Sequence, residues 1–415
     1  MHLSADVLLA CLTCAYWTAS LLILALRVGE PRFGSLARYG GRYVAAPAAR
    51  NSEKTHFPRR GVALMRQTHC WRWSRMCVAG VVAFLERSSL CRVQVSRKYS
   101  FCAFYLTGIV SSLLLLYVDS GPLCVAASTS SAAANAGLTV NDALGHYKSL
   151  PLIAFLIHCV VRFWECLCVH RFRGGPHDRV TLFAAAAGCS FYIFAASSSS
   201  LVVLHTLRAA LVCRREVGAS ELPGGIHRSS SAVAPAAVVL FLLHLLLQWV
   251  QSLHHRMLAK LRGGPAGPRG GAAATSQQSL VGVRGGDARD AADALGSSSS
   301  SSTYCFPRTG LFAYVLEPHY ACEIAMYVVN ALSIWALVSP ADALHVVLAA
   351  TLQWEGYRYV LLLVTCCTAP LGVLLFSLCN LAITASEHRR FWNCVNDEQE
   401  GKIHVPRWNL FYHVW

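Results

Sequence analysis

The chain has 415 residues, of which 55% are hydrophobic and only 14% charged, and its formal net charge is +15. Soluble domains usually carry about 25% charged residues, so the composition excludes an ordinary soluble protein and indicates an integral membrane protein. A nucleic-acid-binding protein would need a soluble basic domain with interleaved aromatic residues. The sequence has no such domain, so no nucleic-acid partner is expected.

Several apolar stretches are long enough to cross a bilayer, which requires roughly 20 residues in a helix. Four of them are uncharged and three carry isolated polar groups. The predicted spans are residues 7–26, 99–118, 150–169, 180–204, 233–253, about 314–338, and 360–384. We therefore expect an all-α integral membrane protein with about seven transmembrane helices.

The first span has no basic segment before it and is longer than the apolar part of a signal peptide, which favours an uncleaved anchor. From Arg27 to Lys98 there are 15 lysines and arginines but three acids, whereas residues 119–149 contain one lysine and two aspartates. By the positive-inside rule the first loop is cytosolic and the second lumenal. Residues 1–98 are thus predicted to be an anchor helix plus a long basic cytosolic loop. The N-terminus is then lumenal and the C-terminus cytosolic.

The chain has 18 cysteines, most of them inside the predicted spans, where cysteine behaves as a small apolar residue. Cys11 and Cys14 form a CxxC pair, but no second pair or nearby histidine completes a set of four zinc ligands. No metal site is expected.

Polar residues in the third span fall on one helical face. His158, Arg162 and Glu165 follow a spacing of four and then three residues, which aligns them along the helix. They could form an Arg–Glu pair that neutralises itself against a neighbouring helix. They could instead form a polar wall of a cofactor cavity open to the cytosol, because arginine binds phosphate with two parallel hydrogen bonds.

Residues 263–302 are rich in Gly, Ala, Ser and Arg, contain no aromatic residue and end in six serines. Such a segment cannot bury a core, so we predict a disordered insertion. Its ends can remain close together, because the entropy of loop closure grows only logarithmically with length.

The sixth span has a second polar stripe, since His319, Glu323 and Tyr327 follow one another at intervals of four. Pro318 is compatible with a helix start at this point. A lone buried histidine is usually structural, but ionisable residues at membrane depth are expensive and indicate function. His388 follows the seventh span, where a basic cluster is typical of a topology anchor.

Four segments, in order, resemble the steroid 5-alpha-reductase family, in particular its polyprenol reductase branch. They are FCAFY (101–105), RFWECLCV (162–169), HHRMLAKLR (254–262) and YVLEPHYACEIAMYV (314–328). The resemblance covers roughly residues 95–407 with gaps and leaves the N-terminal segment and residues 263–302 unmatched. The chain looks longer than these relatives before His388, where residues 343–354 form either a lumenal or re-entrant element or a further crossing that would invert the C-terminus.

The resemblance implies a membrane reductase domain over residues 99–262 and 303–415, located in the endoplasmic reticulum. It implies NADPH as cofactor and a polyprenoid lipid as substrate, in dolichol biosynthesis for protein N-glycosylation. The residues that it assigns to the cofactor are Arg162, His255, Arg262, Tyr304, His319, Glu323 and His388.

Hydride adds to a carbon–carbon double bond only when a conjugated group takes up the charge, so a polyprenal is chemically favoured over a polyprenol as the immediate substrate. A donor must then stabilise the enolate oxygen. The tyrosine that serves this purpose in steroid-reducing relatives corresponds here to Cys159, and we expect Cys159 and Glu165 to contact the substrate. The proton donor is open among His158, Glu165 and Tyr105.

Other functions remain open from the sequence. A reductase of steroids (a 3-oxo-5-alpha-steroid 4-dehydrogenase) or of very-long-chain enoyl-CoA would use the same scaffold. A membrane methyltransferase that binds S-adenosylmethionine has similar polar C-terminal helices. A transporter is less favoured, because the inverted repeat typical of transporters is missing. The sequence does not predict the oligomeric state.

Overall fold

The computed structural model describes residues 5–29, 80, 83–84, 87–120, 147–172, 178–200, 230–261, 306–338, 356–398 and 405–411. Within these ranges seven helices are long and apolar enough to cross a membrane, which confirms the predicted multi-pass protein. They are α1 (Ala5–Gly29), α6 (Arg97–Ser120), α8 (Leu150–Trp164), α9 (Leu182–Ser199), α11 (Ser230–Leu261), α12 (Pro318–Leu337) and α14 (Gly356–Glu398). In the third span α8 continues into a π-helical turn, η2 (Glu165–Val169).

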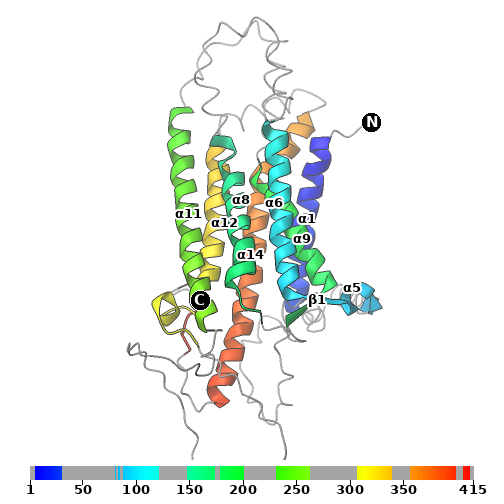
Figure 1. The fold of residues 1–415 in the computed structure, drawn as a ribbon. Helices are drawn as coiled ribbons and strands as arrows, with labels where there is room; N and C mark the ends of the chain where they lie inside the picture. The colour runs from blue at the N-terminus through cyan, green and yellow to red at the C-terminus, as the bar shows by residue number, and fades with distance from the viewer. Residues whose placement is uncertain are drawn as a thin grey trace, which may run out of the picture.

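The seven helices form one bundle in which successive helices run in opposite directions (Figure 1). Helix α11 packs on α12 and α8, α6 packs on α9 and α8, and α14 packs on α1 and α12. Helix α1 begins at one end of the bundle, and residues 405–411 lie at the opposite end, which we call the C-terminal end (Figure 1). Which of the two ends faces the cytosol is still a prediction from the loop charges.

Two helices are longer than a bilayer requires. Helix α11 has 32 residues and α14 has 43, whereas roughly 20 residues suffice for the hydrocarbon core. The far end of α14 extends past the other helices at the C-terminal end (Figure 1). Hydropathy predicted earlier ends for both spans, because polar residues interrupt the apolar pattern although the helical hydrogen bonds continue. His255 and His388 therefore lie on helices rather than in loops.

A small sheet adds to the predicted all-α fold. Strands β1 (Gln94–Ser96) and β2 (Arg179–Thr181) pair antiparallel, with Val95 opposite Val180. A short helix, α5 (Ser89–Arg92), precedes β1. The pairing ties the segment before α6 to the segment before α9, so it fixes the first residues of these two neighbouring spans relative to each other.

Aromatic side chains and close helix approaches build the core beside the site. Its buried rings include Trp17, Phe104, Tyr105, Phe155 and Tyr192. Glycines in the helices let these rings pack against the backbone, a common device where membrane helices meet. A Cβ atom at Gly188 would lie 2.4 Å from the Phe104 ring, and a Cβ atom at Gly372 would lie 2.5 Å from Trp17.

Some predicted features lie outside the described residues. They are the insertion at 263–302, the additional element at 343–354, most of the 27–98 loop, and two of the residues assigned to the cofactor, Arg262 and Tyr304.

Candidate functional site

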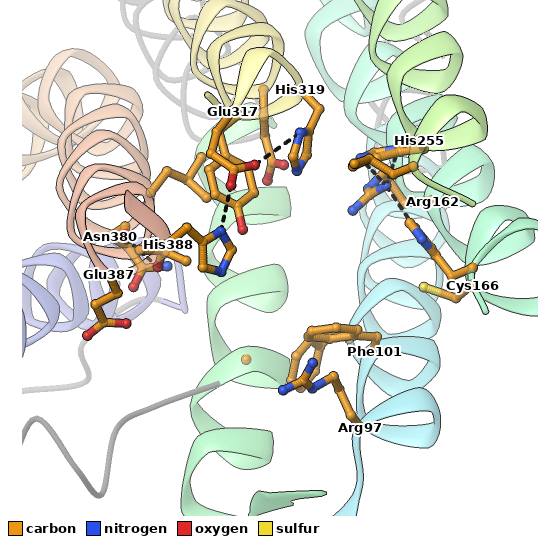
Figure 2. Close-up of a pocket in the computed structure, with 18 of the residues that line it drawn as sticks. Arg97, Phe101, Arg162, Cys166, His255, Glu317, His319, Asn380, Glu387 and His388 are labelled. Carbon is orange, nitrogen blue, oxygen red and sulfur yellow. Dashed lines mark hydrogen bonds and ion pairs between the residues drawn. The ribbon is translucent and has the colours of Figure 1, made fainter. Parts of the chain in front are cut away.

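A cavity of about 470 Å³ lies among the helices near the C-terminal end of the bundle. One part of its lining is charged or polar and another part is aromatic. The polar wall comprises Arg162, His170, His255, Glu317, His319, Glu323 and His388. The aromatic wall comprises Phe101, Phe104, Phe191, Tyr192 and Phe376. Figure 2 shows Arg162 and His255 on one side, facing Glu317, His319 and His388 on the other.

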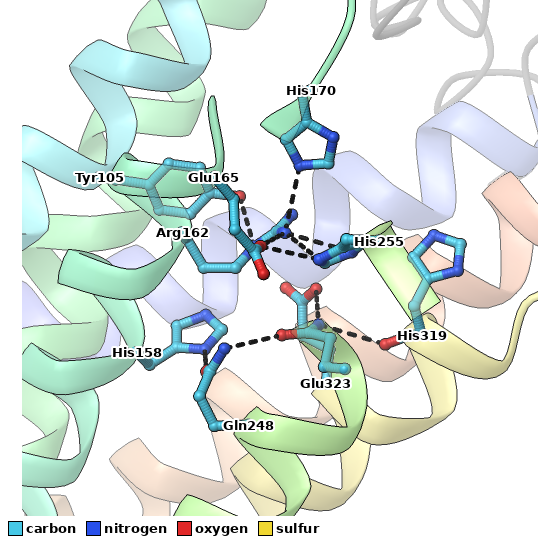
Figure 3. A network of polar contacts seen from close by, with 10 residues as sticks. Tyr105, His158, Arg162, Glu165, His170, Gln248, His255, His319 and Glu323 are labelled. Atoms are coloured by element: carbon cyan, nitrogen blue, oxygen red, sulfur yellow. Dashed lines mark hydrogen bonds and ion pairs between the residues drawn. The ribbon is translucent and has the colours of Figure 1, made fainter. Parts of the chain in front are cut away.

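Arg162 is the centre of the polar wall on the α8 side. Its Nη1 atom donates to Glu165 Oε2 at 2.6 Å and lies 2.7 Å from His255 Nδ1. Its Nε atom donates to the hydroxyl of Tyr105 at 3.2 Å. The carboxylate belongs to the π-helical turn that follows α8, a distortion often found at functional sites. Helices α6, α8 and α11 thus hold one guanidinium group in a fixed orientation (Figure 3).

His255 faces an acceptor and a donor with the same ring nitrogen. Its Nδ1 atom lies 2.8 Å from Glu165 Oε2 and 2.7 Å from Arg162 Nη1. Arginine can only donate and a carboxylate can only accept, so His255 Nδ1 can satisfy one of these partners in a given tautomer. Because Arg162 and Glu165 already neutralise each other, the neutral imidazole fits this position without adding a buried charge.

The opposite side of the polar wall joins α12 to α14. Glu317, which precedes the first residue of α12, accepts from His388 Nδ1 at 2.7 Å and lies 3.5 Å from His319 Nδ1. Helix α12 begins at Pro318, as the sequence predicts. The two histidines and the carboxylate therefore form a second charged group across the cavity from Arg162.

The C-terminal segment 405–411 positions Glu317. The backbone N–H of Leu316 donates to Trp408 O at 2.8 Å, and that of Glu317 donates to Asn409 O at 3.0 Å. Arg389 on α14 donates to the Asn409 side chain and to Arg407 O. Residues far apart in the chain thus hold one carboxylate beside the cavity.

A chain of amides leads from the cavity toward the membrane interior (Figure 3). Gln251 Nε2 donates to Glu323 Oε2 at 3.2 Å, and Gln248 Nε2 donates to Gln251 Oε1 at 3.5 Å. Gln248 Oε1 lies 2.6 Å from His158 Nδ1. His158 is therefore connected to the cavity through this chain, but it does not line the cavity.

Arg27 supplies a further polar group at the edge of the cavity. Its side chain, on the last turn of α1, donates to Asn380 Oδ1 at 2.7 Å and to Glu387 Oε2 at 3.2 Å. Both partners lie on α14, so the pair ties the first span to the last. Arg27, Arg97 and Arg171 also line the cavity, as do Glu387 and Asp178, the acids paired with Arg27 and Arg97.

Three described residues could form part of a metal site. Ligand atoms of Glu165, His170 and His255 lie within 4.8 Å of one another. The guanidinium of Arg162, however, contacts Glu165 at 2.6 Å and His255 at 2.7 Å. A metal ion bound there would stand beside a permanent positive charge, so this arrangement fits an internal ion pair better than a cation site.

The structure brings together the predicted cofactor residues that it describes. These five residues line the one cavity: Arg162, His255, His319, Glu323 and His388. Tyr105, one of the candidate proton donors, also lines it. Glu165 contacts Arg162 but does not itself line the cavity. His158 and Cys159 are also buried and do not line it. Cys159 packs in the aromatic core, where its sulfur would lie 2.6 Å from a Cβ atom at Gly108.

Sequence reasoning missed several residues of the site. Glu317 and His170 were overlooked, although Glu317 is an ionisable residue within the predicted sixth span and His170 directly follows the third, which is a usable signal. Gln248 and Gln251 were also overlooked, although they stand at i−7 and i−4 from His255 on one face of α11. The role of residues 405–411 carries no local signal, because it depends on backbone pairing across the chain.

No protein-family model matches the chain, and neither the curated proteins nor the solved structures include a significant match to it.

Proposed function

We propose that the protein is an NADPH-dependent reductase of the endoplasmic reticulum membrane. Its substrate would be a polyprenol or polyprenal whose α-isoprene double bond becomes saturated, in dolichol biosynthesis for protein N-glycosylation. One observation carries the proposal. The described residues among those that the family resemblance assigns to NADPH come from α8, α11, α12 and α14, and they line the same cavity.

Arginines of the cavity can bind the phosphates of NADPH. The described lining residues include four arginines, Arg27, Arg97, Arg162 and Arg171, together with four acids, Asp178, Glu317, Glu323 and Glu387. Arg162 uses Nε and Nη1 for its contacts within the described residues, and Nη2 has two further N–H groups that can donate to a phosphate. Guanidinium groups bind phosphate oxygens through paired hydrogen bonds. Arg162, His255, His319 and His388 would thus hold the cofactor, whose bound form supplies the hydride.

The aromatic wall fits an isoprenoid chain. Phe101, Phe104, Phe191 and Phe376 line the cavity. Burial of apolar surface is worth about 25 cal/mol per Å², so an apolar chain laid against these rings gains affinity without any polar contact. A polar head near Arg162 and an apolar chain along the rings would orient the double bond between the two walls.

S-adenosylmethionine carries a positive sulfonium group and no phosphate, so in the methyltransferase alternative the arginines that line the cavity would have no phosphate to bind. A reductase of steroids or of enoyl-CoA would use the same cofactor wall and differs only in what occupies the aromatic wall. The substrate class must therefore be decided by competition between substrates.

The proposal is tested with purified protein in lipid nanodiscs. NADPH oxidation is followed with a polyprenal, a polyprenol and a steroid enone supplied in parallel, and the products are identified by mass spectrometry. We expect oxidation with the polyprenal and a product with one fewer double bond. Absence of NADPH oxidation with all three substrates contradicts the reductase proposal. Faster oxidation with the steroid enone would instead indicate a steroid reductase.

A further inference from the structure

Tyr105 occupies a distinct position between the two walls of the cavity. Its side chain is 6% exposed and lines the cavity from α6. Its ring lies 5.1 Å from the Tyr192 ring of the aromatic wall, and its hydroxyl accepts from Arg162 Nε of the polar wall. The Tyr105 hydroxyl therefore lies where the polar and the aromatic lining residues meet.

The direction of the hydrogen bond from Arg162 leaves the Tyr105 proton available. Arginine can only donate, so the phenolic oxygen accepts in this contact and its own O–H is not used there. The guanidinium carbon lies 5.3 Å from the centre of the Tyr105 ring. The Arg162 Nε–H can continue to donate to the phenolate oxygen after the proton leaves.

The other two candidate donors do not reach the cavity. His158 is 2% exposed, its Nδ1 is bonded to Gln248, and it is absent from the lining. Glu165 is 1% exposed, and its Oε2 atom contacts both Arg162 and His255. Of the three candidates, Tyr105 alone presents a donor to the cavity.

We infer that Tyr105, polarised by Arg162, donates a hydrogen bond and then a proton to the carbonyl oxygen of an α,β-unsaturated aldehyde. The inference rests on the proposed reductase function. NADPH, when bound, would supply the hydride that adds to the β-carbon. As the π electrons of the double bond shift toward the carbonyl, the oxygen takes the Tyr105 proton. The products of this step are an enol and a tyrosinate.

The enol then becomes the saturated aldehyde. The α-carbon takes a proton from water, and the enol proton returns to the tyrosinate, so Tyr105 is restored. The overall change is the addition of one hydride from the nicotinamide and one proton from solvent. Arg162 acts as the positioning residue, because it stabilises the tyrosinate while Glu165 holds its guanidinium in place.

The test measures the carbonyl group directly, without cofactor. Citral, a short isoprenoid enal labelled with a heavy isotope at its carbonyl carbon, is bound to the protein in nanodiscs, and the infrared carbonyl band is recorded. In the unmodified protein the Tyr105 hydrogen bond should lower the stretching frequency. In Tyr105→Phe the band should return toward the frequency of free citral. Turnover of polyprenal by that variant should fall about 10²–10⁴-fold, the usual range for a lost general acid.

A matched control removes a hydroxyl that the inference does not use. Tyr327 is 5% exposed and does not line the cavity, and its hydroxyl has no hydrogen-bond partner among the described residues. Tyr327→Phe should keep the lowered frequency and the turnover. NADP⁺ affinity, measured by calorimetry, should be unchanged in Tyr105→Phe, which shows that the variant is folded.

The outcomes separate this inference from the proposed function. Three results would overturn the role of Tyr105. The carbonyl frequency of citral could stay lowered in Tyr105→Phe, or it could return to the free value in Tyr192→Phe instead. The unmodified protein could also show no band of bound citral. If the band depends on Tyr105 but NADPH is never oxidised, the carbonyl site is supported and the reductase proposal is wrong. If polyprenal is reduced equally well by Tyr105→Phe, the reductase stands and Tyr105 is not its acid.

Discussion

Glu317 Oε1 lies 2.7 Å from His388 Nδ1, although 71 residues separate the two in the sequence. The contact joins the start of α12 to the part of α14 that extends beyond the bundle. It closes the polar wall opposite Arg162, and the C-terminal segment fixes the Glu317 backbone from behind. We therefore interpret His388 as a cavity residue rather than as a membrane anchor.

This assignment predicts a binding defect in His388→Ala. The side chain is 45% exposed, so its removal should change the melting temperature little. Loss of a hydrogen-bonding group to a charged ligand should weaken NADPH binding about tenfold. Calorimetric titration of the purified protein with NADPH measures the effect. Arg390→Ala is the matched control, because Arg390 is exposed on the same helix and does not line the cavity. Equal affinities for the two variants would leave His388 as a topology anchor.

The pair of Arg162 and Glu165 predicts a stability effect. Their side chains are 11% and 1% exposed, so Glu165→Gln leaves an uncompensated positive charge. Removal of one partner of a buried pair typically costs about 3–5 kcal/mol, which should lower the melting temperature in detergent clearly. Asp178→Asn is the control, because its partner Arg97 is 3.9 Å away and the pair is more exposed. We expect a much smaller change there, of at most about 1 kcal/mol.

A double substitution distinguishes a pair that only neutralises itself from a pair that helps to bind the cofactor. Arg162→Met combined with Glu165→Met removes both charges, and such replacements are often neutral or stabilising. We predict that the double variant recovers thermal stability but binds NADPH at least about tenfold more weakly. A double variant that is stable and also keeps its NADPH affinity would show that the pair only neutralises itself.

Gly188 predicts a defect that is specific to the lipid substrate. A Cβ atom there would meet the Phe104 ring at 2.4 Å, so Gly188→Ala must move a ring of the aromatic wall. Gly372→Ala is equally crowded, at 2.5 Å from Trp17, but Gly372 does not line the cavity. Both variants should lose about 1–3 kcal/mol of stability from overpacking. Only Gly188→Ala should raise the KM for polyprenal while NADPH affinity stays unchanged, as steady-state kinetics and titration will measure.

The charge pattern of the loops predicts the orientation of the bundle. An N-glycosylation sequence added before α1 should be modified in microsomes, and one added after the C-terminus should not. A mobility shift that disappears on deglycosylation measures this. Modification of the C-terminal site alone would mean that the orientation is the reverse of the predicted one and that the cavity lies at the lumenal end.

The sequence predicted the features that depend on local pattern. Long apolar runs determine the seven spans, because a helix satisfies its own backbone hydrogen bonds in a bilayer and needs roughly 20 apolar residues to cross it. The spacing of Arg162 and Glu165 placed them on one face, and they do form an ion pair. The resemblance supplied His255 and His388, which no spacing argument connects to Arg162.

Features that depend on contacts between distant segments were not predictable. Strands β1 and β2 have three residues each and carry no alternating pattern that identifies a strand. The bond from Arg27 to Glu387 joins the first and last spans, and either residue alone resembles an ordinary flanking charge. The π-helical turn at Glu165 is likewise set by packing, since its sequence is compatible with a continuing α-helix.

Transfer of deuterium tests the central claim most directly. The purified protein is given polyprenal together with NADPH that carries deuterium at the transferred position, and the product is examined by mass spectrometry and NMR. The account predicts a saturated aldehyde with a single deuterium at the β-carbon, formed by the unmodified protein and by Arg390→Ala but only slowly by Tyr105→Phe. An unchanged polyprenal, or a saturated product without deuterium at that carbon, would contradict it.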